Sequence, residues 1–158
     1  IRDRVVPEAD RVTPNQVELG FVTGTSPDTL ESTLDAVHRL REIGPRSVLV
    51  TSVERPERAH EEVMEMIAVT GDETWIIETP RLPIKANGSG DVTAALFTAH
   101  LLRTGDAGES LARTASSVFT LLEQTLASGQ RELRLIEAQD AYAEPSMRFE
   151  ARLLTSHV

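Results

Sequence analysis

The segment from Asn87 to Asp91 has the residue types and spacing that chemistry on phosphate needs. It is rich in glycine and leads directly into an apolar-periodic run from Val92 to Leu102. A helix that begins at such a turn leaves its first N–H donors unpaired and carries partial positive charge there. Gly88 and Gly90 let a phosphate approach the backbone, and Asp91 can accept a proton from an attacking hydroxyl. The segment predicts a phosphoryl-transfer site, and the alternative is a tight loop in which Asp91 only caps the helix.

A second group of polar residues contains Asn15 and Glu18, which lie three positions apart at the start of a predicted helix and so share one face. An amide and a carboxylate placed in this way can hold the water shell of Mg²⁺, which binds through few protein ligands beside substrate phosphates. The alternative is an ordinary helix N-terminus, with Asn15 as the cap and Glu18 as its capping-box partner.

Two hydroxyl side chains, Thr51 and Ser52, follow the apolar run Val48 to Val50. Doubly wound α/β sheets bind ligands at the carboxyl ends of their strands, so this pair is a third candidate for ligand contact. The alternative is ordinary turn chemistry at the end of a strand.

The composition narrows the class of protein. The 158 residues include 16 basic and 25 acidic side chains, which gives a formal net charge of −9. This charge repels nucleic-acid phosphate and anionic membrane surfaces, so we expect neither as a partner. Cysteine is absent and no apolar run is long enough to span a bilayer, which fits the cytoplasm. The four histidines are scattered rather than in zinc-ligand spacing. Because the sequence opens on Ile1, we expect a segment upstream of it.

Helix and strand signals alternate in the first third of the chain, which predicts an α/β fold with a mainly parallel sheet. Proline and glycine mark most of the boundaries. The predicted elements are a strand end at 11–13, a helix at 15–22, a helix that starts from Ser26 and Pro27 and ends at Gly44, and a buried strand at 47–51.

The rest of the chain predicts a hairpin followed by a pair of helices. Residues 53–62 are polar without a clear period, which indicates a loop or flap. The further predicted elements are a hairpin of 63–70 and 74–79 at the sheet edge, a helix after Asp91, a helix that begins near Asp106 with Glu109 as a capping partner, a short helix within 133–142, and a strand or extended tail at 149–154. The first of these helices has the apolar stripe Val92, Ala95, Leu96, Ala99 and Leu102. The second should bury Leu111, Ala115, Val118, Phe119, Leu122 and Leu126.

The three polar motifs, in this order, resemble the ribokinase-like superfamily and, within it, the pyridoxal kinases. The run Ala9 to Glu18, followed by Leu19 and Val22-Thr23-Gly24, looks like the pyridoxal kinase form of the Asn-x-x-Glu region. The closing segment Glu132 to Asp140, with Pro145 and Phe149 after it, is similar to the tail of bacterial pyridoxal kinases. Lys85-Ala86-Asn87 departs from the Asp-Thr that many superfamily members carry before the glycine motif.

This resemblance implies a three-layer ribokinase-like fold, of which residues 1–158 form the C-terminal, nucleotide-binding part of one domain while the N-terminal half is absent. The implied reaction is ATP- and Mg²⁺-dependent phosphorylation of the 5′-hydroxymethyl group of pyridoxal, a small-molecule substrate, by a homodimer when the protein is complete. The residue roles that it implies are Asp91 as base, Gly88, Ser89 and Gly90 as anion hole, Thr13, Asn15, Thr51 and Ser52 at ATP phosphates or their cations, Glu18 at Mg²⁺, and Leu82 and Ile84 at the adenine.

Two alternatives stay open at this stage. One is another kinase of the superfamily that acts on hydroxymethylpyrimidine or a sugar, although the closing segment favours the pyridoxal kinases. The other is a catalytically silent nucleotide-binding or dimerisation module, because the half that holds the substrate in the family lies outside this sequence.

Overall fold

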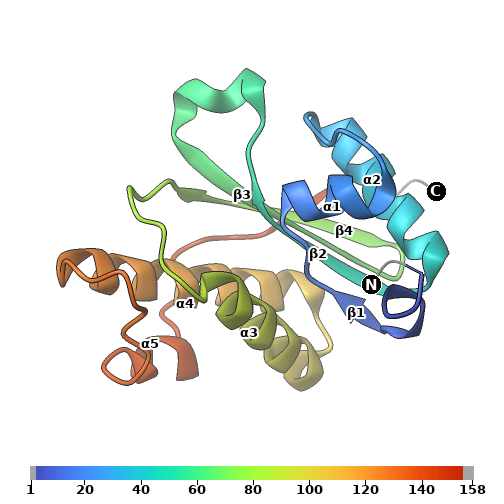
Figure 1. Ribbon diagram of the computed structural model, residues 1–158. Coiled ribbons are helices and arrows are strands. Elements are labelled where there is room, and N and C mark those ends of the chain that lie inside the picture. Colours follow the sequence, from blue (N-terminus) through green and yellow to red (C-terminus); the bar gives the residue numbers. More distant parts are fainter. Residues whose placement is uncertain (1–2, 155–158) are drawn as a thin grey trace.

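The computed structural model describes residues 3–154, which form one five-stranded sheet with helices on both faces (Figure 1). The strands are β1 (Arg11–Val12), β2 (Ser47–Val53), β3 (Val63–Thr70), β4 (Glu73–Pro80) and β5 (Arg152–Leu154). The α-helices are α1 (Gln16–Thr23), α2 (Leu30–Ile43), α3 (Ser89–Thr104), α4 (Ala107–Ala127) and α5 (Gln139–Ala143), and two 3-10 helices are η1 (Val6–Glu8) and η2 (Pro56–Glu61).

The sheet is mixed, and the prediction of a mainly parallel sheet is wrong for the described strands. The strand order is β1-β2-β3-β4-β5, and only β1 and β2 pair in parallel. The reason is the hairpin: Thr70 pairs with Glu73, so only Gly71 and Asp72 connect β3 to β4, and a two-residue loop joins antiparallel strands. The hairpin itself is confirmed, but it is not at the sheet edge, because β5 pairs with the outer side of β4.

Two apolar cores lie on the two faces of the sheet, because alternate residues of each strand point to opposite faces. On one face, Val48 and Val50 of β2 pack with Val37 and Leu40 of α2. On the other face, Leu49 packs among side chains of β3, β4, α3 and α4. Figure 1 shows the same arrangement, with α1 and α2 on one side of the sheet and α3 and α4 on the other.

The start of α2 differs from the sequence prediction by three residues. Thr29, rather than Ser26, is the N-cap, and its side chain and that of Ser32 form a reciprocal capping box. Pro27 is buried outside the helix, where its carbonyl accepts hydrogen bonds from the side chains of Gln16 and Thr33. That carbonyl contact holds Pro27 in the loop, so the capping signal two residues later decides the boundary.

Helix α3 begins at Ser89, so Asp91 lies inside its first turn. The predicted apolar stripe is partly wrong, because the buried residues are Thr93, Phe97 and His100, whereas Ala95, Ala99 and Leu102 are exposed. The ring of Phe97 fills the core beneath the sheet and thereby sets the rotation of the helix.

Helix α4 is capped by Asp106 as predicted, since Asp106 Oδ1 accepts a hydrogen bond from the backbone N–H of Glu109. Most of its predicted core residues are buried or half-buried, but Leu126 is 37% exposed near the end of the helix. Trp75 of β4 lies against the backbone of α4 at Gly108, where a Cβ would come within 2.9 Å of the indole ring. The predicted helix within 133–142 is shorter and later, at Gln139–Ala143. The segment predicted as a strand or extended tail at 149–154 contains β5 in its last three residues.

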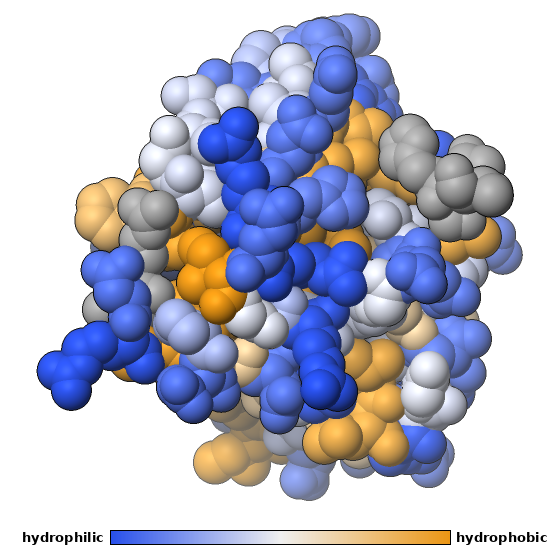
Figure 2. Space-filling view, turned by 90° about the vertical axis from the view of Figure 1, so that its right-hand side faces the viewer, coloured by the Kyte–Doolittle hydropathy of each residue, from blue (hydrophilic) through white to orange (hydrophobic). Residues whose placement is uncertain are grey.

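The surface gives no sign of one large apolar face on the side drawn in Figure 2. Hydrophobic side chains there form separate patches between hydrophilic ones. Within residues 3–154, none of the helices combines the length and the apolar character needed to cross a membrane.

Candidate functional site

A cavity of about 850 Å³ brings residues from most of the chain together. Its wall comes from the start of α1, the end of β2, the strands β3 and β4, the segment that leads to α3, and one face of α4. Four side chains of α4 complete this wall, namely Ala115, Val118, Phe119 and Leu122.

Seven of the eleven residues predicted from the sequence line this cavity. They are Asn15, Thr51, Ser52, Leu82, Ile84, Ser89 and Gly90. The other four lie outside its lining, although each is within two positions of a lining residue in the chain: Thr13, Glu18, Gly88 and Asp91.

The start of α1 and the end of β2 are joined by backbone contacts. Asn15 and Thr51 form an isolated parallel bridge, and Thr51 N–H donates to the carbonyl of Pro14 over 3.0 Å. Both residues therefore border the same part of the cavity, as expected from their places at the ends of two elements.

Ser52 has an unusual backbone conformation, with φ at 53°, in the left-handed region that few non-glycine residues adopt. It lies where the pairing of β2 with β3 shifts register between Val50 and Val53. A register shift of this kind turns a side chain away from the alternation of the strand. Here the exposed hydroxyl of Ser52 borders the cavity instead of packing on the sheet.

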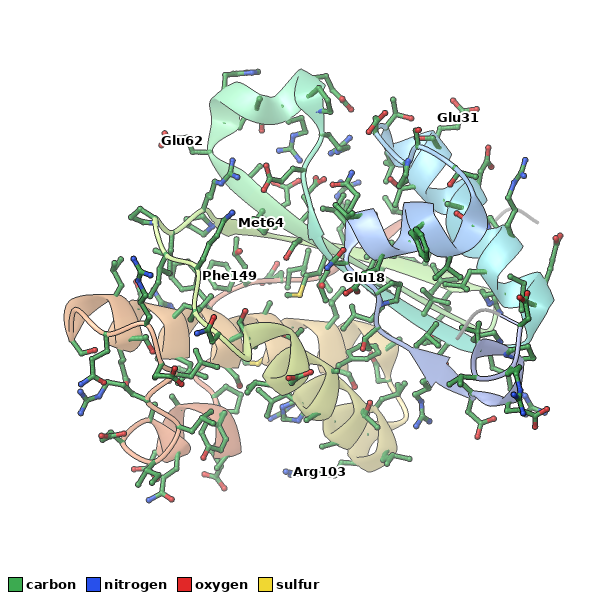
Figure 3. All side chains as sticks on the ribbon, in the orientation of Figure 1. Glu18, Glu31, Glu62, Met64, Arg103 and Phe149 are labelled. Carbon is green, nitrogen blue, oxygen red and sulfur yellow. The ribbon has the colours of Figure 1, made fainter. Side chains whose placement is uncertain are left out.

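Asn15 and Glu18 form the reciprocal cap that sequence analysis gave as the alternative to an ion site. Asn15 Oδ1 accepts from Glu18 N–H over 2.8 Å, and Glu18 Oε2 accepts from Asn15 N–H over 2.9 Å. Glu18 is exposed at the start of α1 (Figure 3), and Oε1 forms no hydrogen bond to the described residues. A carboxylate has about four acceptor positions, so this group can cap the helix and still accept from a hydrated cation.

The N-terminus of α3 meets the geometric requirement for anion binding. Gly88 is the N-cap with φ at 82°, a left-handed conformation that glycine adopts without strain, and no side chain caps the helix. Ser89 and Gly90 border the cavity, so the first turn of α3 presents its backbone toward it. Asp91 belongs to the same turn, and it is exposed. Phosphate groups bind favourably at such a helix end.

The apolar part of the cavity is larger than the sequence indicated. Leu82 and Ile84 are half-buried there, and Met64 and Met66 of β3 face them together with Phe119. Met64 lies near the start of β3 (Figure 3). Sequence reasoning missed the two methionines and Phe119, because their hydrophobic spacing is equally typical of core residues.

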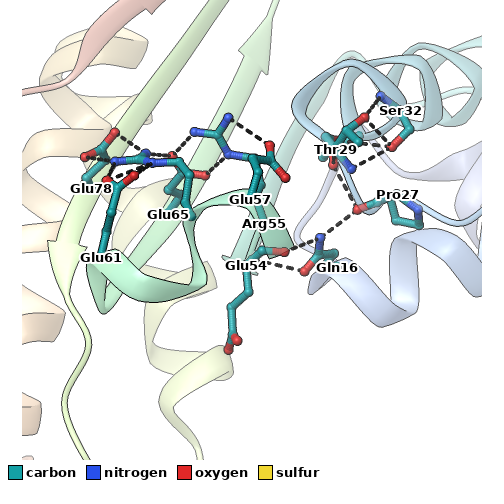
Figure 4. Close-up of polar contacts among 12 residues, drawn as sticks. Gln16, Pro27, Thr29, Ser32, Glu54, Arg55, Glu57, Glu61, Glu65 and Glu78 are labelled. Atoms are coloured by element: carbon teal, nitrogen blue, oxygen red, sulfur yellow. Dashed lines mark hydrogen bonds and ion pairs between the residues drawn. The ribbon is translucent and has the colours of Figure 1, made fainter.

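A network of ion pairs ties the flap between β2 and β3 to the sheet (Figure 4). Glu65 of β3 is buried, and it accepts from Arg55 Nε at 2.7 Å, from Arg55 Nη2 at 2.6 Å and from Arg58 Nη1 at 2.5 Å. Arg58 also donates to Glu78, which lies opposite Glu65 in the β3–β4 pairing. The hydrogen bonds that Arg58 donates to Glu61 and Glu78 raise the pKa of Arg58, and the bond that Glu78 accepts from Arg58 lowers the pKa of Glu78.

The prediction of a loop or flap is confirmed for residues 54–62, with η2 at its centre, whereas Val53 is a buried residue of β2. The network that holds the flap was not predicted. The arginines and Glu65 lie in a stretch whose charges show no period. Their contacts depend on the register that places Glu78 beside Glu65. Gln16 was also missed, although it contacts Glu54 across 38 positions of sequence.

Within the described residues, no three His, Cys, Asp or Glu side chains come together as a metal-binding group. The cavity has mixed character: an apolar half with Leu82, Ile84 and Phe119, and a polar half with Ser52 and the first turn of α3. This division suits a ligand with one flat apolar end and one anionic end.

The sequence of this chain is similar to one family model and to several known proteins. A family model described as phosphomethylpyrimidine kinase matches residues 1–135. A pyridoxal kinase (PdxY) of Leifsonia xyli subsp. xyli is 62% identical to this chain over 149 residues, or 94% of this chain and 52% of that protein. A pyridoxal kinase (PdxY) of Corynebacterium diphtheriae is 52% identical over 150 residues, which cover 95% of this chain and 53% of that protein. The chain thus spans about half the length of these relatives.

Solved structures share the fold. The pyridoxal kinase from Leishmania donovani in complex with ADP and pyridoxine matches with a TM-score of 0.87 at 20% identity, over 98% of this chain and 53% of that one. Similarity at this level of identity concerns the path of the backbone, so it shows the fold.

Proposed function

This chain belongs to the phosphomethylpyrimidine kinase family, and from that premise we propose that it is the nucleotide-binding part of an ATP-dependent pyridoxal kinase. Its relatives named pyridoxal kinase confirm the resemblance drawn from the Asn15 to Glu18 motif, the glycine motif and the closing segment. In the proposed reaction the γ-phosphoryl group of ATP passes to the 5′-hydroxymethyl group of pyridoxal. The ribokinase-like domain, of which residues 1–158 form the C-terminal part, is completed by chain outside this sequence, and the complete protein is a homodimer.

One observation carries the proposal: a single cavity collects the polar ends of α1 and β2, the first turn of α3 and an apolar wall. In the proposed complex the adenine lies against Leu82 and Ile84. The phosphates then extend toward Thr51, Ser52 and Asn15 on one side and toward Ser89 and Gly90 on the other. A nucleotide is apolar at its base and anionic at its phosphates, which matches the apolar and polar halves of this cavity.

The chemical step rests on positioning and on charge stabilisation, as in phosphoryl transfer generally. Backbone N–H groups at Gly88 to Gly90 stabilise the charge that develops on the transferred phosphoryl group. Asp91, exposed one position after them, accepts the proton of the substrate hydroxyl as that oxygen attacks phosphorus. The oxygen–phosphorus bond to the leaving ADP breaks as the bond to the hydroxymethyl oxygen forms.

Mg²⁺ fits the residues present through Glu18 and its free Oε1, together with water and the phosphates. This cation usually keeps several waters and uses one or two carboxylates beside the substrate phosphates. When bound, it would neutralise part of the phosphate charge. Thr13, half-buried after β1, and Asn15 complete the polar side of this region.

A second candidate is a catalytically silent nucleotide-binding or dimerisation fragment. Two observations favour it: the chain covers about half of its relatives, and Asp91 lies outside the lining of the cavity. In this case the substrate pocket is formed by chain outside the sequence, and residues 1–158 bind nucleotide without turnover.

Calorimetry with ATP and Mg²⁺ on the 158-residue chain, beside a kinase assay, tests the two candidates. Turnover by the 158-residue chain refutes the silent fragment, and no binding refutes both candidates. Binding without turnover agrees with both, and a kinase assay of the complete protein then decides between them. In the complete enzyme, phosphorylation of pyridoxal but not of hydroxymethylpyrimidine or a sugar assigns the substrate class.

The role of Asp91 has its own test in the complete enzyme. Asp91→Asn should lower kcat by about two orders of magnitude while the affinity for ATP changes little, because general-base catalysis contributes on that scale. Near-normal turnover would remove Asp91 from the mechanism.

A further inference from the structure

Gln16 forms an unusual set of hydrogen bonds with the end of β2. Its side-chain Nε2 donates to the carbonyl of Glu54 over 3.1 Å, and its Oε1 accepts from Glu54 N–H over 3.0 Å. The side-chain amide thus pairs with both backbone groups of one residue, as a neighbouring strand would. Nε2 also donates to the carbonyl of Pro27 over 2.6 Å, which ties the α1–α2 loop to the same point (Figure 4).

These bonds close a short segment between two anchors. Thr51 is fixed on one side by its hydrogen bond to Pro14, and Glu54 on the other by Gln16. Between the anchors lies Ser52, whose φ of 53° is costly for a residue with a side chain. A strained conformation of this kind persists only where its surroundings over-determine it, and the two anchors supply that constraint.

We propose that Gln16 is a positioning residue that holds Ser52 in its left-handed conformation, so that the Ser52 hydroxyl and backbone face the phosphates of a bound nucleotide. The inference rests on the proposed function, because it assigns the phosphates to this half of the cavity. Gln16 occupies the position after Asn15, so a single turn of chain supplies the helix cap, the cavity wall and the amide that orders β2.

The test compares two ligands that differ only in phosphate. In the Gln16→Leu variant of the complete protein, the Kd for ADP should rise about tenfold, because the Ser52 hydroxyl and backbone would no longer be held toward the phosphates. The Kd for adenosine should stay within about twofold, since adenosine has no phosphate and its base lies at the apolar wall. Gln124→Leu, at an exposed site on α4 outside the cavity, is the matched control and should leave both constants unchanged.

Backbone exchange measures the contact itself. In Gln16→Leu the amide hydrogen of Glu54 should exchange about tenfold faster. The exchange rate of the Thr51 amide, which donates to Pro14, should change less. The Ser52→Gly background provides a second measurement, because glycine adopts positive φ without strain. If Gln16 acts through Ser52, adding Gln16→Leu to Ser52→Gly should change the Kd for ADP by no more than about twofold.

Several results would overturn the inference. Equal weakening of ADP and adenosine would show that Gln16 affects the fold rather than the phosphate site. Faster exchange at Glu54 with an unchanged Kd for ADP would show that the contact has no part in nucleotide binding. An unmodified chain that binds neither ligand would instead refute the proposed function, and this inference with it, whereas the first two results leave the proposed function standing.

Discussion

The flap between β2 and β3 should depend on the buried carboxylate of Glu65, and Glu65→Gln tests this dependence. The Glu65 side chain is 2% exposed, and those of Arg55 and Arg58 are 13% and 19% exposed. Glutamine keeps the volume but removes the charge, and its amide N–H₂ would face guanidinium donors. Breaking a buried ion pair by changing one partner costs about 3–5 kcal/mol, because it leaves uncompensated charge.

Urea unfolding followed by circular dichroism measures this cost. With a slope of about 2 kcal/mol per M, the midpoint for Glu65→Gln should fall by about 2 M. The control is Glu109→Gln, which removes the Glu109–Arg113 pair, whose side chains are 42% and 32% exposed. An exposed pair four residues apart on a helix contributes only about 0.5 kcal/mol.

Salt separates the two pairs further, since ions screen exposed charges far more than buried ones. The effect of Glu109→Gln should vanish in concentrated NaCl, whereas that of Glu65→Gln should persist. The reasoning is refuted if Glu65→Gln costs no more than Glu109→Gln, for the flap would then be held by its apolar contacts rather than by this carboxylate.

Three further predictions concern stability. Gly108→Ala should destabilise the fold by about 1–3 kcal/mol, because its Cβ would meet the Trp75 ring, and the same change in a Trp75→Leu background should cost less. Burial lowers the pKa of His100, so the unfolded chain binds a proton more readily than the folded one. The free energy of unfolding should therefore fall as the pH drops below about 6.5. His100→Gln should reduce this dependence on pH in urea titrations. Asp106→Ala should cost about 1 kcal/mol by removing the cap on Glu109 N–H, and Asp106→Asn should retain most of it.

Each of the three has an outcome that would contradict it. Equal effects of Gly108→Ala with and without the Trp75 ring would exclude the steric explanation. An unchanged pH slope in His100→Gln would mean that another group titrates, and His38→Gln, at an exposed site, provides the comparison. Loss of stability in Asp106→Asn equal to that in Asp106→Ala would assign the effect to charge rather than to capping.

Local signals in the sequence predicted local structure well. Asn15 with Glu18, the glycine after α1, the turn at Gly71-Asp72 and the cap at Asp106 each act within a few residues, and each has its predicted place in the fold. The motif residues also lie around one cavity, since the ends of strands and helices carry them. Their assigned roles in binding and catalysis remain predictions.

Features that depend on distant partners could not be predicted in this way. The direction of β3 and β4 relative to β2 follows from pairing across the sheet, and helical periodicity in α3 fits more than one buried face until Phe97 has its neighbours. The Gln16 contact with Glu54 joins a helix start to a strand end, and neither residue type signals it. Such contacts leave no local pattern, because glutamine and glutamate are ordinary surface residues.

Lys85 is a side chain at the cavity that can be labelled chemically. It borders the cavity, its side chain is exposed, and it is the only lysine in the sequence. Besides the α-amino group, an amine-directed fluorophore or isotope label therefore attaches to one side chain of this chain, next to Ile84 and a few residues before the first turn of α3. A fluorophore on Lys85 would therefore report on molecules that enter the cavity, without any substitution in the chain.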